Sequence, residues 1–164
     1  EIQPIKNGAQ GFAQGVAYVD PQVKILSQNT GSMDDVNAAK ELAKSFIGQG
    51  ADVLSPMANQ ASLGVMEAAQ ESGACKAIGS GLNQETVAPD AAVTAVVKDT
   101  SIAYEAAYKA YLAGEFPNEP IKMGAAQGVI YIGDYYTEAS DDVKAQIADI
   151  YAKLAAGEIT ITLQ

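Results

Sequence analysis

The sequence predicts an α/β protein built on a three-layer arrangement, a parallel sheet with helices on both faces. Two neighbouring stretches predict it. Residues 20–56 contain the apolar run VKILSQ (23–28), a helical stretch, and a second run, ADVLSP (51–56). Residues 51–80 repeat the pattern with a helix and the run KAIGS (76–80). Because a helix joins successive strands, the strands should be parallel, and their trailing loops should meet at one edge of the sheet.

The first half of the chain is expected to alternate helices and strands. A helix over 5–19 follows Pro4, which suits a first turn, and it ends where Asp20 precedes a proline. The next helix, 35–47, has Ser32 or Asp34 as candidate caps and a glycine-rich end. Apolar periodicity predicts the remaining elements, which are strands at 23–28, 51–56 and 76–80 and a helix at 61–72.

The second half continues with the strand VTAVV (93–97) and a helix over 100–112 that Gly114 ends. Small residues give this helix a packing face, and its three tyrosines are interpreted as packing or rim residues. Ser140 is expected to cap a last helix with an apolar stripe that Gly157 ends. The packing face is Ile102, Ala103, Ala106, Ala107 and Ala110; the tyrosines are Tyr104, Tyr108 and Tyr111; the stripe is Val143, Ile147, Ile150 and Leu154. Strands are predicted at 121–126, 128–133 and, as an edge strand, 158–163.

Composition excludes several functional classes. The 164 residues carry ten lysines, no arginine and no histidine, against twenty acidic residues, for a net charge of −10. This charge argues against nucleic acid and anionic membranes as partners, and the missing residue types remove histidine catalysis and arginine clamps for phosphate. Cys75 is the single cysteine and is interpreted as a structural thiol. No metal site or cofactor is predicted: Asp34 and Asp35 fit the first turn of a helix, and GSG at 79–81 lacks the rest of a dinucleotide fingerprint.

Polar loops after the predicted strands are the candidate ligand contacts. Met57, Asn59 and Gln60 follow the strand at 51–56, and the two amides can donate to and accept from a neutral polar ligand. Simple solvation of the loop explains them equally well. A glycine-rich polar loop, 79–90, follows the strand KAIGS.

The order of several short motifs resembles the basic membrane protein family of bacterial substrate-binding lipoproteins. These motifs run through nearly the whole chain: GFAQGVAYVDPQVKILSQNTGS, DD, AAK, GQGADVL, GVMEAA, AIG, NQ, APD, AVVK, AGEF and AAGEI. The resemblance implies one lobe of a type I periplasmic binding protein, in the C-terminal half of a longer receptor whose N-terminal lobe is missing. Residues 1–86 and 120–164 would form the second lobe, which lacks its first strand, and residues 87–119 would return to the first lobe.

The same resemblance implies ligand contacts. Lys98, at the end of AVVK, would face the ligand, and Asn83 and Gln84 would supply hydrogen bonds where relatives place an aspartate, here Gly81. The loop Met57-Ala58-Asn59-Gln60 replaces a glycine-rich loop of the family. The implied function is capture of a nucleoside or sugar-like solute for the permease of an ABC importer. The implied location is extracytoplasmic, either periplasmic or as a membrane-anchored lipoprotein.

Two alternatives stay open beside this non-enzymatic function. A truncated or engineered single lobe would retain the fold with vestigial binding, and its sheet would have an exposed edge. An enzyme would have to rest on Lys98, on Cys75, or on the carboxylates Asp99 and Asp134; a buried lysine can form Schiff bases, and a lysine with an aspartate is a possible acid/base pair. No spacing in the sequence selects that chemistry.

Overall fold

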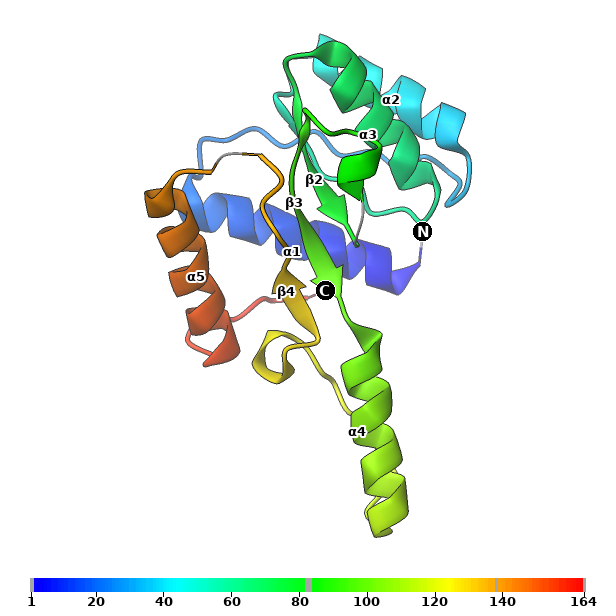
Figure 1. The fold of residues 1–164 in the computed structure, drawn as a ribbon, viewed down its shortest axis with the longest axis vertical. Helices are drawn as coiled ribbons and strands as arrows, with labels where there is room; N and C mark the ends of the chain where they lie inside the picture. Colours follow the sequence, from blue (N-terminus) through cyan, green and yellow to red (C-terminus); the bar gives the residue numbers. More distant parts are fainter. Residues whose placement is uncertain (1, 82–83, 138, 164) are drawn as a thin grey trace. The chain divides into compact units, whose positions relative to one another are not determined.

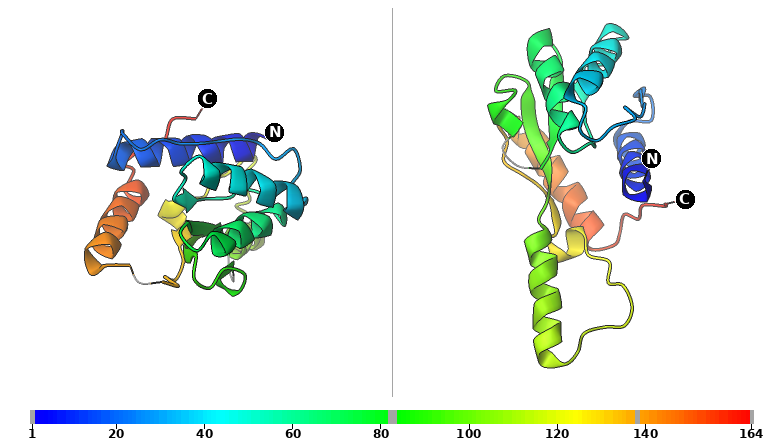
Figure 2. Two further views of the ribbon diagram at one scale, coloured as in Figure 1. Left: turned by 90° about the horizontal axis from the view of Figure 1, so that it is seen from above. Right: turned by 90° about the vertical axis from the view of Figure 1, so that its right-hand side faces the viewer.

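The computed structural model describes residues 2–81, 84–137 and 139–163. It divides into two compact units (Figures 1 and 2). Unit 1 comprises Glu1–Ala95, Asp134–Glu138 and Ile161–Gln164, and unit 2 comprises Val96–Gly133 and Ala139–Thr160. The elements are α1 (Gln3–Val19), α2 (Val36–Gly48), β1 (Val53–Leu54), α3 (Ala61–Ser72), β2 (Lys76–Ser80), η1 (Gln84–Thr86), β3 (Ala92–Lys98), α4 (Thr100–Ala113), η2 (Ala125–Gln127), β4 (Ile130–Ile132) and α5 (Asp141–Ala155).

The fold class is α/β, as predicted. A four-stranded, mostly parallel sheet has the order β1-β2-β3-β4. β1 pairs in parallel with β2, with Val53 opposite Lys76 and Leu54 opposite Ala77. One difference from the predicted parallel sheet is β4, which runs antiparallel to β3 and places Ile132 opposite Val96. β4 follows α4 through a long turn with η2.

The core of unit 1 consists mainly of alanine. It is formed by Ala43, Leu54, Met66, Ala68, Ala69, Cys75, Ala77, Ala88, Ala91 and Ala92. Such small side chains let helices and strands approach closely, and α2 and α3 show this most clearly. A Cβ atom on Gly64 of α3 would overlap the backbone carbonyl oxygen of Val36. The smallest residues of α2 and α3 therefore make the tightest contacts between the two helices.

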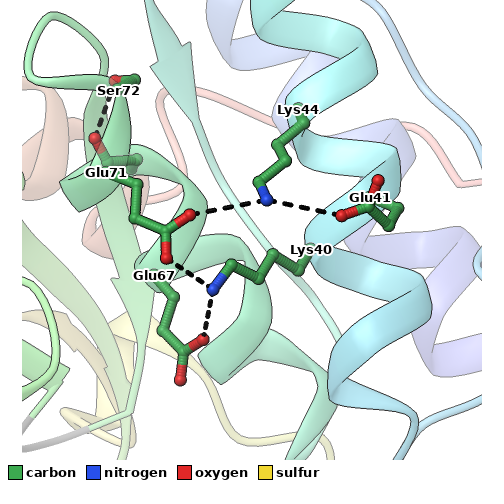
Figure 3. A network of polar contacts seen from close by, with 7 residues as sticks. Lys40, Glu41, Lys44, Glu67, Glu71 and Ser72 are labelled. Carbon is green, nitrogen blue, oxygen red and sulfur yellow. Dashed lines mark hydrogen bonds and ion pairs between the residues drawn. The ribbon is translucent and has the colours of Figure 1, made fainter.

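Ion pairs join the exposed sides of α2 and α3 (Figure 3). Lys40 Nζ lies 3.0 Å from Glu67 Oε2 and 2.7 Å from Glu71 Oε1. Lys44 Nζ lies 3.5 Å from the other oxygen of Glu71 and 3.4 Å from Glu41 Oε1. Hydrogen bonds and charge from the glutamates raise the pKa of Lys40, and the hydrogen bond from Lys40 lowers the pKa of Glu71. The network links α2 and α3, the two helices that follow the loops 29–35 and 55–60.

Three predicted strands are absent from the structure. Residues 23–28 form no strand, and they pair with no strand in the described part of the chain. Residues 121–126 lead through a bend into η2 instead of forming a strand. Residues 158–163 form no strand, and the Gln14 side chain of α1 donates to the carbonyl of Thr162 at 2.8 Å and accepts from its N–H at 2.9 Å. A side-chain amide thus replaces the sheet partner.

Unit 2 consists of the end of β3, α4, η2, β4 and α5. The Tyr151 hydroxyl of α5 donates to the carbonyls of Ala125 and Ile130, at 3.2 and 3.1 Å, and so attaches α5 to η2 and β4. Ser140 caps α5 as predicted, accepting from Val143 N–H at 3.3 Å. The sequence predicted that α4 and α5 would pack through buried apolar faces. This prediction is wrong, because neither helix has a buried residue among those described. Their apolar faces are half-buried at best.

Candidate ligand-binding site

The carboxyl ends of β1 and β2 lie at one edge of unit 1, because the two strands are parallel neighbours. Residues 55–60 follow β1, and the loop that contains η1 follows β2. A third loop, 29–35, leads into α2 and is tied to the start of α3 by a hydrogen bond of 3.0 Å from Ala61 N–H to the Met33 carbonyl. The described residues of these three loops, 29–35, 55–60 and 84–87, are called the rim.

The loop 29–35 is held in shape by its own side chains. The Thr30 hydroxyl donates to the Ser32 carbonyl at 2.6 Å, and the Ser32 hydroxyl accepts from the N–H groups of Asp34 and Asp35, at 3.1 Å each. Asp35 is the N-cap of α2 and accepts from Ala38 N–H at 2.9 Å. The predicted caps, Ser32 and Asp34, were therefore wrong by one to three residues, although Ser32 organises the turn that precedes the cap.

The loop after β1 presents two free amides. Asn59 and Gln60 are exposed, and their side chains form no hydrogen bond with the described residues. The backbone beneath them is fixed, because the Ser62 hydroxyl donates to the Ala58 carbonyl and accepts from Ala58 N–H at 3.1 Å. Met57 is half-buried against α1, where a Cβ atom on Gly8 would come within 2.7 Å of its sulfur. Met57 therefore anchors the loop, and the amides remain available to a ligand.

The loop after β2 is organised by Gln84. This side chain is buried; its Oε1 accepts from Ser80 N–H at 2.9 Å, and its Nε2 donates to the Ser80 carbonyl at 2.8 Å. Gly79 leaves room for it, because a Cβ atom there would stand 2.5 Å from Gln84 Oε1. Both ends of the Gln84 amide are thus occupied within the loop. Asn83, another predicted contact, lies outside the described residues.

Glu85 and Tyr136 connect this loop to the chain segment around 136. The Glu85 carboxylate lies close enough to act on the Tyr136 hydroxyl through its charge, and Tyr136 N–H donates to the Val93 carbonyl of β3 at 2.8 Å. Burial, followed by the charge of Glu85, raises the pKa of the Tyr136 hydroxyl. Among the described residues, Glu85 Oε2 is the buried side-chain oxygen without a hydrogen-bond partner. Sequence reasoning missed this pair, since nothing in its 51-residue separation indicates contact.

Lys98 is the last residue of β3 and belongs to unit 2. It is exposed, it pairs through its backbone with Ile130, and its ammonium group forms no ion pair with the described residues. The next residue, Asp99, caps α4 by accepting from Ser101 N–H at 3.0 Å. The position of Lys98, immediately before a helix N-terminus, leaves its charge available for a polar solute.

Other chemistry has little support in the described part of the chain. Cys75 is buried, as predicted, and burial together with the nearby charge of Asp52 raises the pKa of its thiol, which favours the unreactive protonated form. No group of three or more acidic, cysteine or histidine side chains there could hold a metal ion. None of the helices in those residues is both long and apolar enough to cross a membrane.

Comparison with known proteins identifies relatives of the whole chain. The family model described as "ABC transporter substrate-binding protein PnrA-like" matches residues 1–163. Basic membrane protein B of Borrelia garinii subsp. bavariensis is 32% identical over 124 residues, which cover 73% of this chain and 36% of the relative. A purine-binding protein of Brucella abortus is 27% identical over 158 residues, which cover 96% of this chain and 44% of the relative.

A solved structure matches the fold. The solute-binding protein of an ABC transporter system from Aeropyrum pernix superposes with a TM-score of 0.84 at 20% sequence identity. The match covers 100% of this chain and 55% of that protein. The chain therefore spans about half the length of the relatives it matches, and its fold corresponds to part of a periplasmic binding protein.

Proposed function

Because this chain belongs to the PnrA-like family of ABC transporter substrate-binding proteins, we propose that it is part of a receptor that captures a nucleoside or sugar-like solute in an interlobe cleft. Members of this family are binding components of transporters and not enzymes, so no reaction at Lys98 is proposed. The observation that carries the proposal is the pair of free amides, Asn59 and Gln60, on a loop whose backbone is already fixed. A binding site needs such preorganised polar groups and no nucleophile.

The chemical class of the ligand is proposed from the hydrogen-bond donors and acceptors of the rim and from Lys98. Side-chain amides both donate and accept, which suits the ring nitrogens, carbonyls and hydroxyls of nucleosides and sugars. Lys98 adds a donor with a positive charge. Gln84 is proposed to shape the loop after β2, since its side chain is buried and its amide bonds to both backbone groups of Ser80. The similarity to a purine-binding protein of Brucella abortus favours a purine nucleoside within this class.

The complete receptor is proposed to have two lobes. Of residues 87–119, which the resemblance assigns to the other lobe, α4 is the part proposed to lie there, because Ala88, Ala91 and Ala92 belong to the core of unit 1. The exposure of α4 supports this assignment, because Tyr104, Tyr108, Tyr111 and Leu112 project from the helix with 75%, 63%, 69% and 65% of their surface exposed. Four large side chains on one helix need a covering surface, and a second lobe would supply it.

The proposed receptor acts outside the cytoplasm, as a periplasmic protein or a lipid-anchored lipoprotein, and delivers its solute to an ABC permease. Closure of two lobes around the ligand would create the form that the permease recognises. The first strand in the sheet order, β1, has a neighbour on one side only, and this free edge favours a second candidate, a single lobe with vestigial binding. The two candidates differ in whether any solute is bound with useful affinity.

A thermal-shift screen tests the proposal. Purine and pyrimidine nucleosides, pentoses and hexoses would be added to the protein, and a bound solute should raise the unfolding temperature with concentration. Asn59→Ala and Lys98→Ala should each reduce the shift, corresponding to a loss of affinity of about tenfold for one lost hydrogen bond. Lys122→Ala, at another exposed lysine, is the control and should leave the shift unchanged. No shift with any solute would favour vestigial binding.

A further inference from the structure

Met57 packs against α1 from the loop after β1. A Cβ atom on Gly8 would come within 2.7 Å of Met57 Sδ and 3.6 Å of its Cε, so the end of the side chain covers the bare Cα of Gly8. The same helix offers a contrast, because a Cβ atom on Gly15 would have nothing within 4 Å. Gly8 therefore forms a notch in α1, and the thioether of Met57 fills it.

The contact helps to hold a helix that is not buried. α1 has no buried residue among those described. In its second half, Gln14 bonds to Thr162, and a Cβ atom on Gly11 would lie 3.9 Å from Ile161. Those contacts tie α1 to the end of the chain, whereas Met57 ties it to the rim.

Met57 also fixes one end of the segment that carries the free amides. The next residue, Ala58, is held by the Ser62 hydroxyl, which donates to its carbonyl and accepts from its N–H at 3.1 Å. Asn59 and Gln60 follow and are exposed. The loop 55–60 is thus attached to α3 through Ser62 and to α1 through Met57. Loss of the Met57 contact would free the loop from α1 and leave its contact with α3 in place.

The sulfur is the chemically sensitive part of the Met57 contact. Met57 is half-buried, whereas Met66 in the core of unit 1 has 0% of its surface exposed. A small oxidant can therefore reach Met57 more readily than Met66. Oxidation converts the apolar thioether to a polar sulfoxide. Because Sδ lies directly over the Gly8 Cα, an added oxygen has no room on that side, and a polar group pressed against the helix would lose its hydration.

We propose that Met57 is an oxidation site whose modification releases the loop 55–60 from α1. The oxidant is a peroxide: in hydrogen peroxide the O–O bond breaks, one oxygen forms the S–O bond of the sulfoxide, and the other leaves as water with both hydrogens. The sulfur loses two electrons and the peroxide gains them. Oxidation and release do not require a solute. Only their consequence, a weaker hold on a solute by Asn59 and Gln60, rests on the proposed function.

The experiment treats the protein with hydrogen peroxide in the absence of any solute. Peptide mass spectrometry follows the gain of one oxygen at each methionine, and hydrogen exchange follows the backbone of α1 and of residues 55–60. Met57→Leu is treated in parallel. Leucine keeps a similar apolar volume and cannot be oxidised, and the variant retains the half-buried Met33 and Met123, so it isolates the effect of Met57.

Met57 should be oxidised at least about tenfold faster than Met66, and exchange in residues 5–12 and 55–60 should then rise about threefold or more. Treated Met57→Leu should show no such rise. Without peroxide, Gly8→Ala should raise exchange in the same residues by filling the notch, whereas Gly15→Ala should not. Equal oxidation of Met57 and Met66, or complete oxidation of Met57 with exchange as in treated Met57→Leu, would overturn the proposal.

Discussion

The side chain of Gln84 bonds to both backbone groups of Ser80, accepting from its N–H at 2.9 Å and donating to its carbonyl at 2.8 Å. In this way one buried amide closes the loop after β2 as a strand partner would. The Cα of Gly79 is part of the same arrangement, because a side chain there would occupy the space of the Gln84 amide. Loop shape at the rim therefore depends on a side chain that already bonds within the loop at both ends of its amide.

Gln84→Ala should destabilise the protein. The substitution leaves two backbone groups of Ser80 without their partners, a loss that typically costs about 1–3 kcal/mol. Urea unfolding followed by circular dichroism measures it. Gln60→Ala, at an exposed amide on the neighbouring loop, is the control and should change stability by less than about 0.5 kcal/mol. Equal changes in the free energy of unfolding for the two substitutions would show that Gln84 does not stabilise the loop.

Gly64→Ala should loosen the contact between α2 and α3. The added methyl group would overlap the Val36 carbonyl and come within 3.0 Å of Lys40 N, so the helices must separate, at a typical cost of about 1–3 kcal/mol. Gly48→Ala is the matched control, because Gly48 is also helical and has no atom near its added Cβ. It should be neutral or stabilising by up to about 1 kcal/mol. A neutral Gly64→Ala measured by thermal unfolding would contradict the close packing.

The ion pairs of Lys40 should make stability depend on pH at both extremes. The pKa of Glu71 is lowered in the folded state, so its contribution is present above the ordinary value of 4.5 and is lost as the pH falls through the lower folded value. The pKa of Lys40 is raised, so its contribution is present below 10.5 and is lost as the pH rises through the higher folded value.

Glu71→Gln should therefore reduce the loss of folding stability at acid pH. Added salt should weaken the ion pairs in the unmodified protein. Unfolding midpoints at pH 3, 7 and 11 give the comparison. Glu119→Gln, which replaces an exposed glutamate with no ion pair among the described residues, should leave the pH profile as it is. A profile that is the same in both variants would show that the Lys40 pairs contribute nothing measurable.

Tyr136→Phe should affect stability most at neutral pH and least at alkaline pH. The folded pKa of Tyr136 is raised, mainly by burial and then by Glu85, so the neutral hydroxyl stabilises the protein until the pH rises through that pKa. Phenylalanine removes the hydroxyl and its ionisation together. Tyr104→Phe, on the exposed side of α4, is the control. The spectrophotometric titration of tyrosinate at about 295 nm should lose its latest-titrating component only in Tyr136→Phe.

Helices were largely predictable from the sequence, and strands were not. α3 has the predicted bounds, Ala61–Ser72, and Ser140 caps α5 as predicted, because capping and periodicity are local properties of the chain. Residues 23–28 have the local signature of a strand but form none, since a strand requires a partner elsewhere in sequence. The same limit explains why the segment 158–163 was predicted wrongly.

The candidate site was predictable as a set of loops but not as a set of contacts. Asn59 and Gln60 lie at a strand's carboxyl end with free side chains, as their place in the sequence indicated. The inward turn of Gln84 was not predictable, because it depends on the space above Gly79. The contact between Glu85 and Tyr136 likewise depends on how the chain returns to β3 at Tyr136.

Calorimetric titration with purine nucleosides tests the central claim, that the rim holds a solute, most directly. The protein in its complete two-lobed form should bind a nucleoside with one saturable site, and Asn59→Ala should weaken that binding about tenfold. A complete receptor that takes up no nucleoside, pentose or hexose, or binds one equally well after Asn59→Ala and Lys98→Ala, would contradict the account.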